Sequence, residues 1–265
     1  MLTKNIWKRG ISLLGAAAMT ASMLTGISFA EGETYTQPTL NPHSKFVLEV
    51  DGYQFIDLNG NGELDVYEDW RQDAETRAAD LVSQMTVREK IAQMQHPTYL
   101  PRADGKIAPY LKDYCSEYGI GMLLIRELNS VEAAATTMNT IQEYAESSRL
   151  GVPVLVSMDS VHGLSYVSGA TVTPHNLALA ATRDEALVTK LAEIARDEHL
   201  AVGVRMTLSP EADIASEPRW GRVMETFGED PDLVTQMVTA QVVAFQNGRD
   251  GLNTADKHGP WIAIR

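Results

Sequence analysis

Residues 151–163 read Gly-Val-Pro-Val-Leu-Val-Ser-Met-Asp-Ser-Val-His-Gly, and this stretch decides the predicted fold. Gly151 and Pro153 break the preceding segment. The apolar run 154–158 that follows is typical of a strand buried on both faces of a parallel sheet. Asp159 comes directly after this run. The stretch therefore predicts a buried parallel strand with polar chemistry placed at its carboxyl end.

The same pattern repeats on both sides of this stretch. Residues 119–125 (GIGMLLI) and 201–208 (AVGVRMTL) are two further strand-like runs. Helices are expected between and after the strands, namely from Ser130 to about Arg149, after a capping box formed by Thr182 and Glu185, and over residues 231–246. Strands that alternate with helices predict a parallel α/β fold. No Gly-x-Gly-x-x-Gly follows any strand, so a dinucleotide-binding unit is not supported.

Polar residues cluster after the ends of these strands, at residues 126–127, 159–163 and 209–230. Chemistry at the carboxyl ends of strands is typical of a (β/α)8 TIM-type barrel. A full barrel takes roughly 250 residues, whereas only three clear strands occur within 119–265. We therefore predict an α/β fold that is a partial barrel of about three βα units over residues 119–265.

The part of the chain before residue 119 has a different organisation. Residues 31–56 are expected to be a linker followed by two short strands that meet at an Asp51-Gly52 turn. Residues 69–118 are expected to be a largely helical segment. Within it, Thr86 precedes Glu89 by the spacing of a capping box.

The first thirty residues have the features of a signal peptide. Lys4, Lys8 and Arg9 precede an apolar stretch over residues 11–27, and Ser28-Phe29-Ala30 fits a cleavage site. The alternative, a membrane anchor, needs about 20 uninterrupted apolar residues, which this stretch does not offer. We expect export to the cell envelope or medium, with no membrane span after cleavage.

Charge and cysteine content exclude several classes of protein. Lys and Arg number 22 against 35 Asp and Glu, a net charge of −13, and without residues 1–30 the balance is 19 against 35, or −16. Such a surface repels phosphate backbones, so nucleic-acid binding is not expected. Cys115 is the single cysteine, which excludes an intramolecular disulfide and is expected to be a small buried side chain.

Residues 57–68 match the calcium-binding loop of an EF-hand. The oxygen-bearing residues stand at the ligand positions of that loop, with Gly62 at the sixth position. The predicted ligands of a structural calcium ion are Asp57, Asn59, Asn61, Glu63 (through its carbonyl), Asp65 and Glu68. The alternative is a polar loop of Asx turns that folds without metal.

Two stretches contain candidate binding residues. Asp159 can accept hydrogen bonds from substrate hydroxyls, or it can cap the start of a following helix. In residues 208–230, Arg222 and Glu225 lie close to Trp220, a combination that suits sugar recognition and equally suits an internal salt-bridge cluster.

These motifs resemble glycoside hydrolase family 3, the β-glucosidase and β-xylosidase group, over roughly residues 57–247. The matching motifs are Met85-Thr86 with Glu89-Lys90 and Met94, residues 148–153, Asp159 with His162-Gly163, residues 218–222 and residues 225–230.

The resemblance implies a (β/α)8-like domain and retaining hydrolysis of β-linked glucosides or oligosaccharides from the non-reducing end. It implies that Asp159 and Arg222 bind the sugar of the first subsite, while His162 and Glu225 match the motifs with supporting roles. The family's nucleophile and acid/base correspond to later segments, so the catalytic residues remain unknown here and the chain alone is expected to be inactive.

The last dozen residues are expected not to follow the family, and Lys257-His258 is interpreted as a coincidental match to the family's Lys-His pair. Two alternatives stay open for function. One is a non-catalytic carbohydrate-binding or calcium-clipped structural module, and the other is a β-xylosidase-like enzyme.

Overall fold

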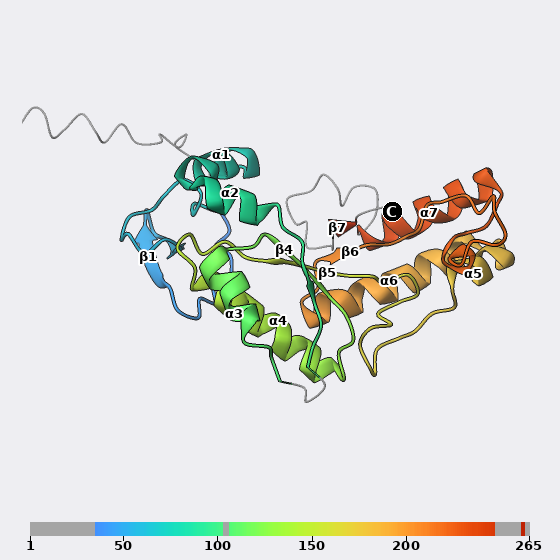
Figure 1. Cartoon of the computed structure of the whole chain (residues 1–265). Helices are drawn as coiled ribbons and strands as arrows, with labels where there is room; N and C mark the ends of the chain where they lie inside the picture. The colour runs from blue at the N-terminus through green and yellow to red at the C-terminus, as the bar shows by residue number, and fades with distance from the viewer. Residues whose placement is uncertain (1–34, 103–105, 247–260, 263–265) are drawn as a thin grey trace, which may run out of the picture. The chain divides into compact units, whose positions relative to one another are not determined.

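A central sheet of five parallel strands organises the chain, and the strands lie in it in the order in which they occur in the sequence (Figure 1). The computed structural model describes residues 35–102, 106–246 and the backbone of 261–262. The strands are β3 (Thr98–Tyr99), β4 (Met122–Ile125), β5 (Leu155–Met158), β6 (Met206–Thr207) and β7 (Trp261–Ile262). Parallel strands placed next to one another in chain order agree with the predicted α/β class and with the wall of a TIM-type barrel.

The central strand prediction is confirmed, and the strands around it differ from expectation in length and number. The runs at 119–125 and 154–158 contain β4 and β5. The run at 201–208 contains only the two-residue strand β6, because the preceding helix continues to Val202 and ends at Gly203, whose φ is 87°. Strand β3 lies inside the segment expected to be helical, where two residues are too few to produce a periodic signal.

Helices alternate with these strands. Their bounds are α1 (Ala74–Gln84), α2 (Val87–Gln93), α3 (Tyr110–Lys112) with the π-helix η1 (Asp113–Tyr118), α4 (Val131–Glu146), α5 (Asn176–Thr182), α6 (Glu185–Val202), the 3-10 helix η2 (Val223–Glu225) and α7 (Pro231–Phe245).

Side-chain caps start several of these helices. Thr86 and Glu89 form the expected capping box, and Ser130 caps α4 through the Ala133 N–H. The second expected capping box is wrong. Asp184 caps α6 through the Leu187 N–H, and Thr182 is the last residue of α5.

Two apolar clusters account for most of the core. The larger lies between β4, β5 and α4 and contains Cys115, whose burial confirms the expected role and raises its pKa to about 12. The smaller joins α5, α6 and α7 around Met237 and Phe227. Helices α6 and α7 run side by side (Figure 1). Both clusters hold the helices against one another while leaving the carboxyl ends of the strands to polar residues.

The hairpin β1 (Phe46–Val50) and β2 (Tyr53–Asp57) confirms the expected strand pair. Asp51 and Gly52 both have positive φ, 53° and 78°, which is the backbone that a two-residue type I′ turn requires. The described residues from 39 onward belong to one compact unit, and residues 35–38 belong to another. Residues 35–38 contain no helix or strand.

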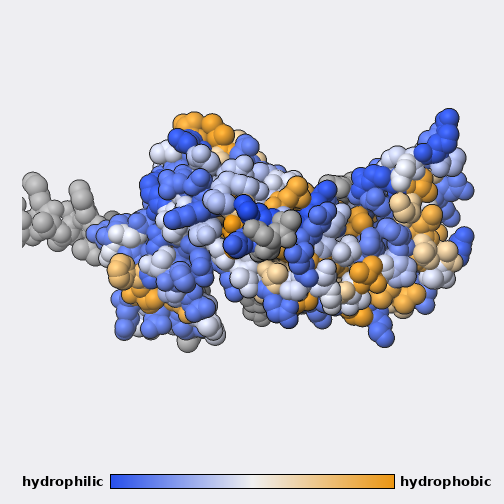
Figure 2. Space-filling view, turned by 60° about the horizontal axis from the view of Figure 1, so that its bottom comes forward, coloured by the Kyte–Doolittle hydropathy of each residue, from blue (hydrophilic) through white to orange (hydrophobic). Residues whose placement is uncertain are grey.

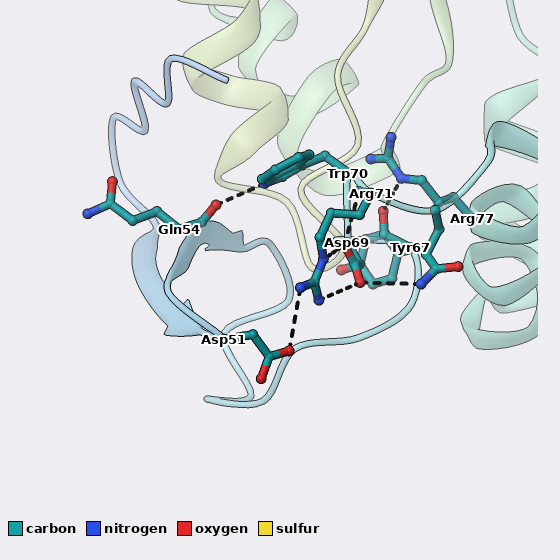
Figure 3. A network of polar contacts seen from close by, with 8 residues as sticks. Asp51, Gln54, Tyr67, Asp69, Trp70, Arg71 and Arg77 are labelled. Carbon is teal, nitrogen blue, oxygen red and sulfur yellow. Dashed lines mark hydrogen bonds and ion pairs between the residues drawn. The ribbon is translucent and has the colours of Figure 1, made fainter. Parts of the chain in front are cut away.

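Arg71, held in a buried ion pair with Asp69, connects the β1–β2 hairpin to the segment that follows it through its ion pair with Asp51 (Figure 3). Arg71 and Asp69 bond through two atom pairs, at 2.9 and 3.0 Å, and both side chains are 3% exposed. The guanidinium of Arg71 also lies 4.7 Å from the centre of the Phe55 ring. Trp70 stacks on Phe55, with ring centres 5.4 Å apart, and donates to the carbonyl of Gln54 at 2.9 Å. Charge pairing and aromatic packing together hold strand β2 in place.

The surface is mainly hydrophilic on the face shown in Figure 2, with separate hydrophobic patches. Exposed apolar side chains stand at both ends of α2, where Val87, its first residue, is 73% exposed and Met94, its C-cap, is 71% exposed. Within the described residues, none of the helices combines the length and apolarity needed to cross a membrane.

Candidate functional site

The carboxyl ends of β4 and β5 bring two charged side chains together. Arg126 follows β4, Asp159 follows β5, and the Arg126 guanidinium donates to Oδ2 of Asp159. The Asp159 side chain is only 6% exposed, so this ion pair lies largely out of contact with solvent on the carboxylate side. The helix-capping alternative for Asp159 is wrong, since the next helix, α5, begins only at Asn176.

A second polar pair involves the same strand, β5, and lies just before its carboxyl end. Nε2 of His96 is 2.7 Å from Oγ of Ser157, which lies on β5 two residues before Asp159. Burial lowers the pKa of His96, and the charge of Asp159 opposes that shift. His96 is therefore a neutral hydrogen-bonding group at neutral pH.

Arg222 is the centre of another ion-pair group, in the long loop after β6. It donates to Oε1 of Glu211 at 2.6 Å and also pairs with Glu225. The hydrogen bond to Glu225 is the main cause that raises the pKa of Arg222. Glu211 is 2% exposed in its side chain, and its backbone forms a β-bridge with Thr226. The loop is thus folded around a fixed Arg222.

Two histidines lie close to each other next to a residue that bonds to this loop. The rings of His162 and His175 are 4.2 Å apart, and the neighbouring Asn176 donates to the carbonyl of Glu225 at 2.9 Å. Burial, followed by the charge of His175, lowers the pKa of His162, and Glu225 opposes this shift. His162 and Glu225 therefore lie in one polar cluster.

The structure thus divides the predicted site residues between two groups. Asp159 is held by Arg126, while Arg222 and Glu225 are held together with Glu211. Arg126 and Glu211 were not predicted as site residues. The sequence could have indicated Arg126 as a site residue, because it directly follows an apolar strand. Nothing in the sequence marked Glu211 as the buried partner of Arg222.

The predicted calcium loop is closed by its own hydrogen bonds. Asp57 is buried, and its carboxylate accepts from the backbone N–H groups of Gly60, Asn61 and Gly62 at 2.7, 3.1 and 2.9 Å. The carboxylate of Glu68 accepts from Leu58 at 2.8 Å, and burial raises its pKa.

Two further predicted ligands meet on one carboxylate. Asn59 and Asn61 donate to Oδ2 of Asp65 at 2.5 and 2.8 Å, and Asn61 accepts from the N–H of Glu63. Across residues 35–102, 106–246 and 261–262, no three or more His, Cys, Asp or Glu side chains are grouped so as to hold a metal ion. Calcium binding stays a prediction.

Two predicted features lie outside the described residues. These are the signal peptide at 1–30 and Lys257-His258.

Comparisons with known proteins agree with the motifs. The sequence model of the Glycosyl hydrolase family 3 N terminal domain matches residues 86–261, and so extends past residue 247, where the resemblance was expected to end. A "Periplasmic beta-glucosidase/beta-xylosidase" from Dickeya chrysanthemi is 40% identical over 233 residues, which are 82% of this chain and 35% of that protein.

Two further relatives agree. "Beta-glucosidase C" from Emericella nidulans is 32% identical over 74% of this chain and 34% of its own length. A solved β-glucosidase from Erythrobacter marinus superposes with a TM-score of 0.65 and 30% identity, covering 76% of this chain and 26% of that one. The chain spans about a third of the length of the curated relatives it matches. The chain belongs to glycoside hydrolase family 3.

Proposed function

We propose that this chain carries part of the sugar-binding site of a β-glucosidase-like retaining glycoside hydrolase, which acts on β-linked glucosides or oligosaccharides from the non-reducing end. Asp159 is the observation that carries the proposal. Its carboxylate stands at the carboxyl end of a central parallel strand, where barrel enzymes place their substrate-binding groups. In this proposal it accepts hydrogen bonds from hydroxyls of the sugar.

Arg222 is the second sugar-contacting residue in this proposal. Its side chain is 40% exposed, although Glu211 and Glu225 hold its guanidinium on one side. A guanidinium has five N–H donors in a fixed fork, so donors remain for a ligand. His162 and Glu225 support the loop in which Arg222 lies.

The names of the relatives support the substrate class and the location. The printed names of the Dickeya and Salmonella relatives both include the words "periplasmic" and "beta-glucosidase". Together with the signal-like residues 1–30, these names support export to the cell envelope. A relative from Formosa agariphila is named "Putative beta-xylosidase" at 34% identity, so a β-xylosidase-like preference is the second candidate.

Sugar binding to the purified chain tests the proposal. We would measure saturation-transfer NMR and titration calorimetry with glucose and with xylose, using Asp159→Ala and the control Asp197→Ala, an aspartate on α6 that is 68% exposed. We expect binding that Asp159→Ala abolishes and Asp197→Ala retains. A wild-type chain that binds neither sugar, or an Asp159→Ala variant that binds equally well, would contradict the proposal, and a preference for xylose would favour the second candidate.

We also propose that residues 57–68 bind a structural calcium ion. Gly62, at the sixth position of the loop, has φ of 81°, which gives the sharp turn that an EF-hand loop has there. Calorimetry after chelation should show calcium-dependent heat that Glu68→Gln reduces at least tenfold in affinity. No heat with calcium would favour the metal-free Asx-turn interpretation.

A further inference from the structure

Arg126 and Asp159 occupy equivalent positions on neighbouring strands. Leu124 of β4 is the register partner of Ser157 of β5. Arg126 and Asp159 each stand two residues further along, so both side chains leave the same edge of the sheet on the same side. Their ion pair follows from the strand register and is not an accidental surface contact.

The chain turns at Glu127, directly after Arg126. Glu127 has φ of 61°, a left-handed conformation that is unfavourable for a residue other than glycine. Leu128 then donates to the carbonyl of Tyr166 at 2.7 Å and accepts from the N–H of Ser168 at 2.9 Å. The loops after β4 and β5 are therefore joined to each other directly beyond the turn at Glu127.

The guanidinium of Arg126 has a donor to spare. It bonds to Asp159 through Nη2 and lies 5.8 Å from the centre of the Tyr166 ring. Its Nε is buried and has no hydrogen-bond partner in the part of the chain that the structure describes. The side chain as a whole is 37% exposed, so a ligand can reach the guanidinium, and a small movement of the side chain presents the buried Nε–H to it. A buried N–H that has no acceptor carries a desolvation penalty in free energy, and a ligand oxygen that accepts from it would offset that penalty.

We propose that Arg126 is a specificity-determining residue of the subsite that contains Asp159, an inference that rests on the proposed function. The Asp159 carboxylate accepts from one sugar hydroxyl, and the Nε–H of Arg126 donates to the oxygen of an adjacent hydroxyl. Because guanidinium and carboxylate neutralise each other, this pair selects a neutral sugar with two adjacent hydroxyls over a uronic acid.

Binding of glucose, its single deoxy analogues and glucuronic acid to the purified chain tests the inference. Arg126→Met removes every donor, and Arg126→Lys keeps the charge beside Asp159 but has no Nε–H. The matched control is Arg88→Met, since Arg88 also lies over a tyrosine ring, 5.4 Å from the centre of Tyr118, but on helix α2. Circular dichroism establishes that each variant is folded, and if Arg126→Met does not fold, Arg126→Lys carries the test.

We expect glucose to bind Arg126→Met at least tenfold more weakly than wild type, Arg126→Lys several-fold more weakly, and Arg88→Met equally well. One deoxy analogue should bind wild type and the Arg126 variants with the same affinity, because the contact is already absent. Glucuronic acid should bind wild type more weakly than glucose.

The possible failures are distinguishable. If wild type binds glucose and Asp159→Ala does not, but both Arg126 variants bind like wild type, the inference falls and the proposed function stands. The inference also falls if every deoxy analogue loses affinity by the same factor in wild type and in the variants, since Arg126 would then act only on Asp159. If wild type binds no neutral sugar, the proposed function fails and the inference with it.

Discussion

The hydroxyl of Ser160 and the buried imidazole of His199 are hydrogen-bonded to each other, one residue beyond Asp159. The other ring nitrogen of His199, Nδ1, lies 2.6 Å from the carbonyl oxygen of Ala195. A carbonyl can only accept, so Nδ1 carries the proton, and Nε2 of the neutral ring accepts from Ser160. Helix α6 is thereby tied, through a neutral histidine, to the residue next to the candidate sugar-binding carboxylate.

This relationship predicts a pH-dependent stability. Burial lowers the pKa of His199, so the folded chain resists a proton that the unfolded chain takes up below about pH 6.5. We expect the free energy of unfolding to fall by about 1.4 kcal/mol per pH unit below that point, until the folded-state pKa is reached. Urea unfolding of wild type and His199→Gln at pH 7.5 and 5.5 measures this, and equal changes in the two proteins would refute it.

Removing Arg71 should destabilise the hairpin region strongly. Arg71→Met leaves the carboxylate of Asp69 buried without its partner, which we expect to cost about 3 kcal/mol in free energy of unfolding. The control is Arg219→Met. Arg219 pairs with Glu217 on the surface with a side chain that is 88% exposed, and no measurable change is expected there. Urea denaturation would contradict the interpretation if both variants lost the same stability.

Gly121, just before β4, allows a close approach of two backbone segments. A Cβ at this position would lie 2.2 Å from the carbonyl oxygen of Gln93, and neither backbone can move far without breaking the hydrogen bond from Gly121 to Ala92. We expect Gly121→Ala to cost about 3 kcal/mol in free energy of unfolding. Gly221→Ala, where a Cβ meets nothing within 4 Å, should change stability little. Thermal denaturation of the two variants distinguishes them, and a Gly121→Ala variant as stable as Gly221→Ala would show that the segments can separate.

Acid should remove the ion pair between α2 and the segment before β5. Hydrogen bonds from Arg149 lower the pKa of Glu89 to about 2. A lowered folded-state pKa stabilises the protein above the unfolded value near 4.5, and this contribution is lost as the pH falls toward 2. The pair is partly exposed, so we expect about 1 kcal/mol at pH 6.

The measurement compares wild type with Glu89→Gln by urea unfolding at pH 6 and near pH 2. The difference in free energy of unfolding should shrink toward zero at the lower pH, and 1 M salt should reduce it at pH 6. A difference that stays constant with pH would assign the effect to helix capping by Glu89 and not to its charge.

The local sequence was sufficient to predict those elements whose conformation depends only on a few adjacent residues. Apolar runs produced β4 and β5, Thr86 with Glu89 produced the start of α2, and Asp51-Gly52 produced the hairpin turn, because burial period, capping and positive φ are properties of a few adjacent residues. The two-residue strand β3 exists only through pairing with a neighbour and has no pattern of its own, and the apolar run that predicted β6 begins within the last turn of α6.

The sequence by itself determined that Asp159 stands at the carboxyl end of a buried strand in a parallel α/β fold. Only the tertiary structure decided that the Asp159 carboxylate forms an ion pair with Arg126. Arg126 lies 33 residues earlier in the chain, and it reaches Asp159 because β4 and β5 pair in a register that places the two residues side by side. Strand register is set by packing across the whole sheet, so a pair such as this one cannot be read from either strand alone.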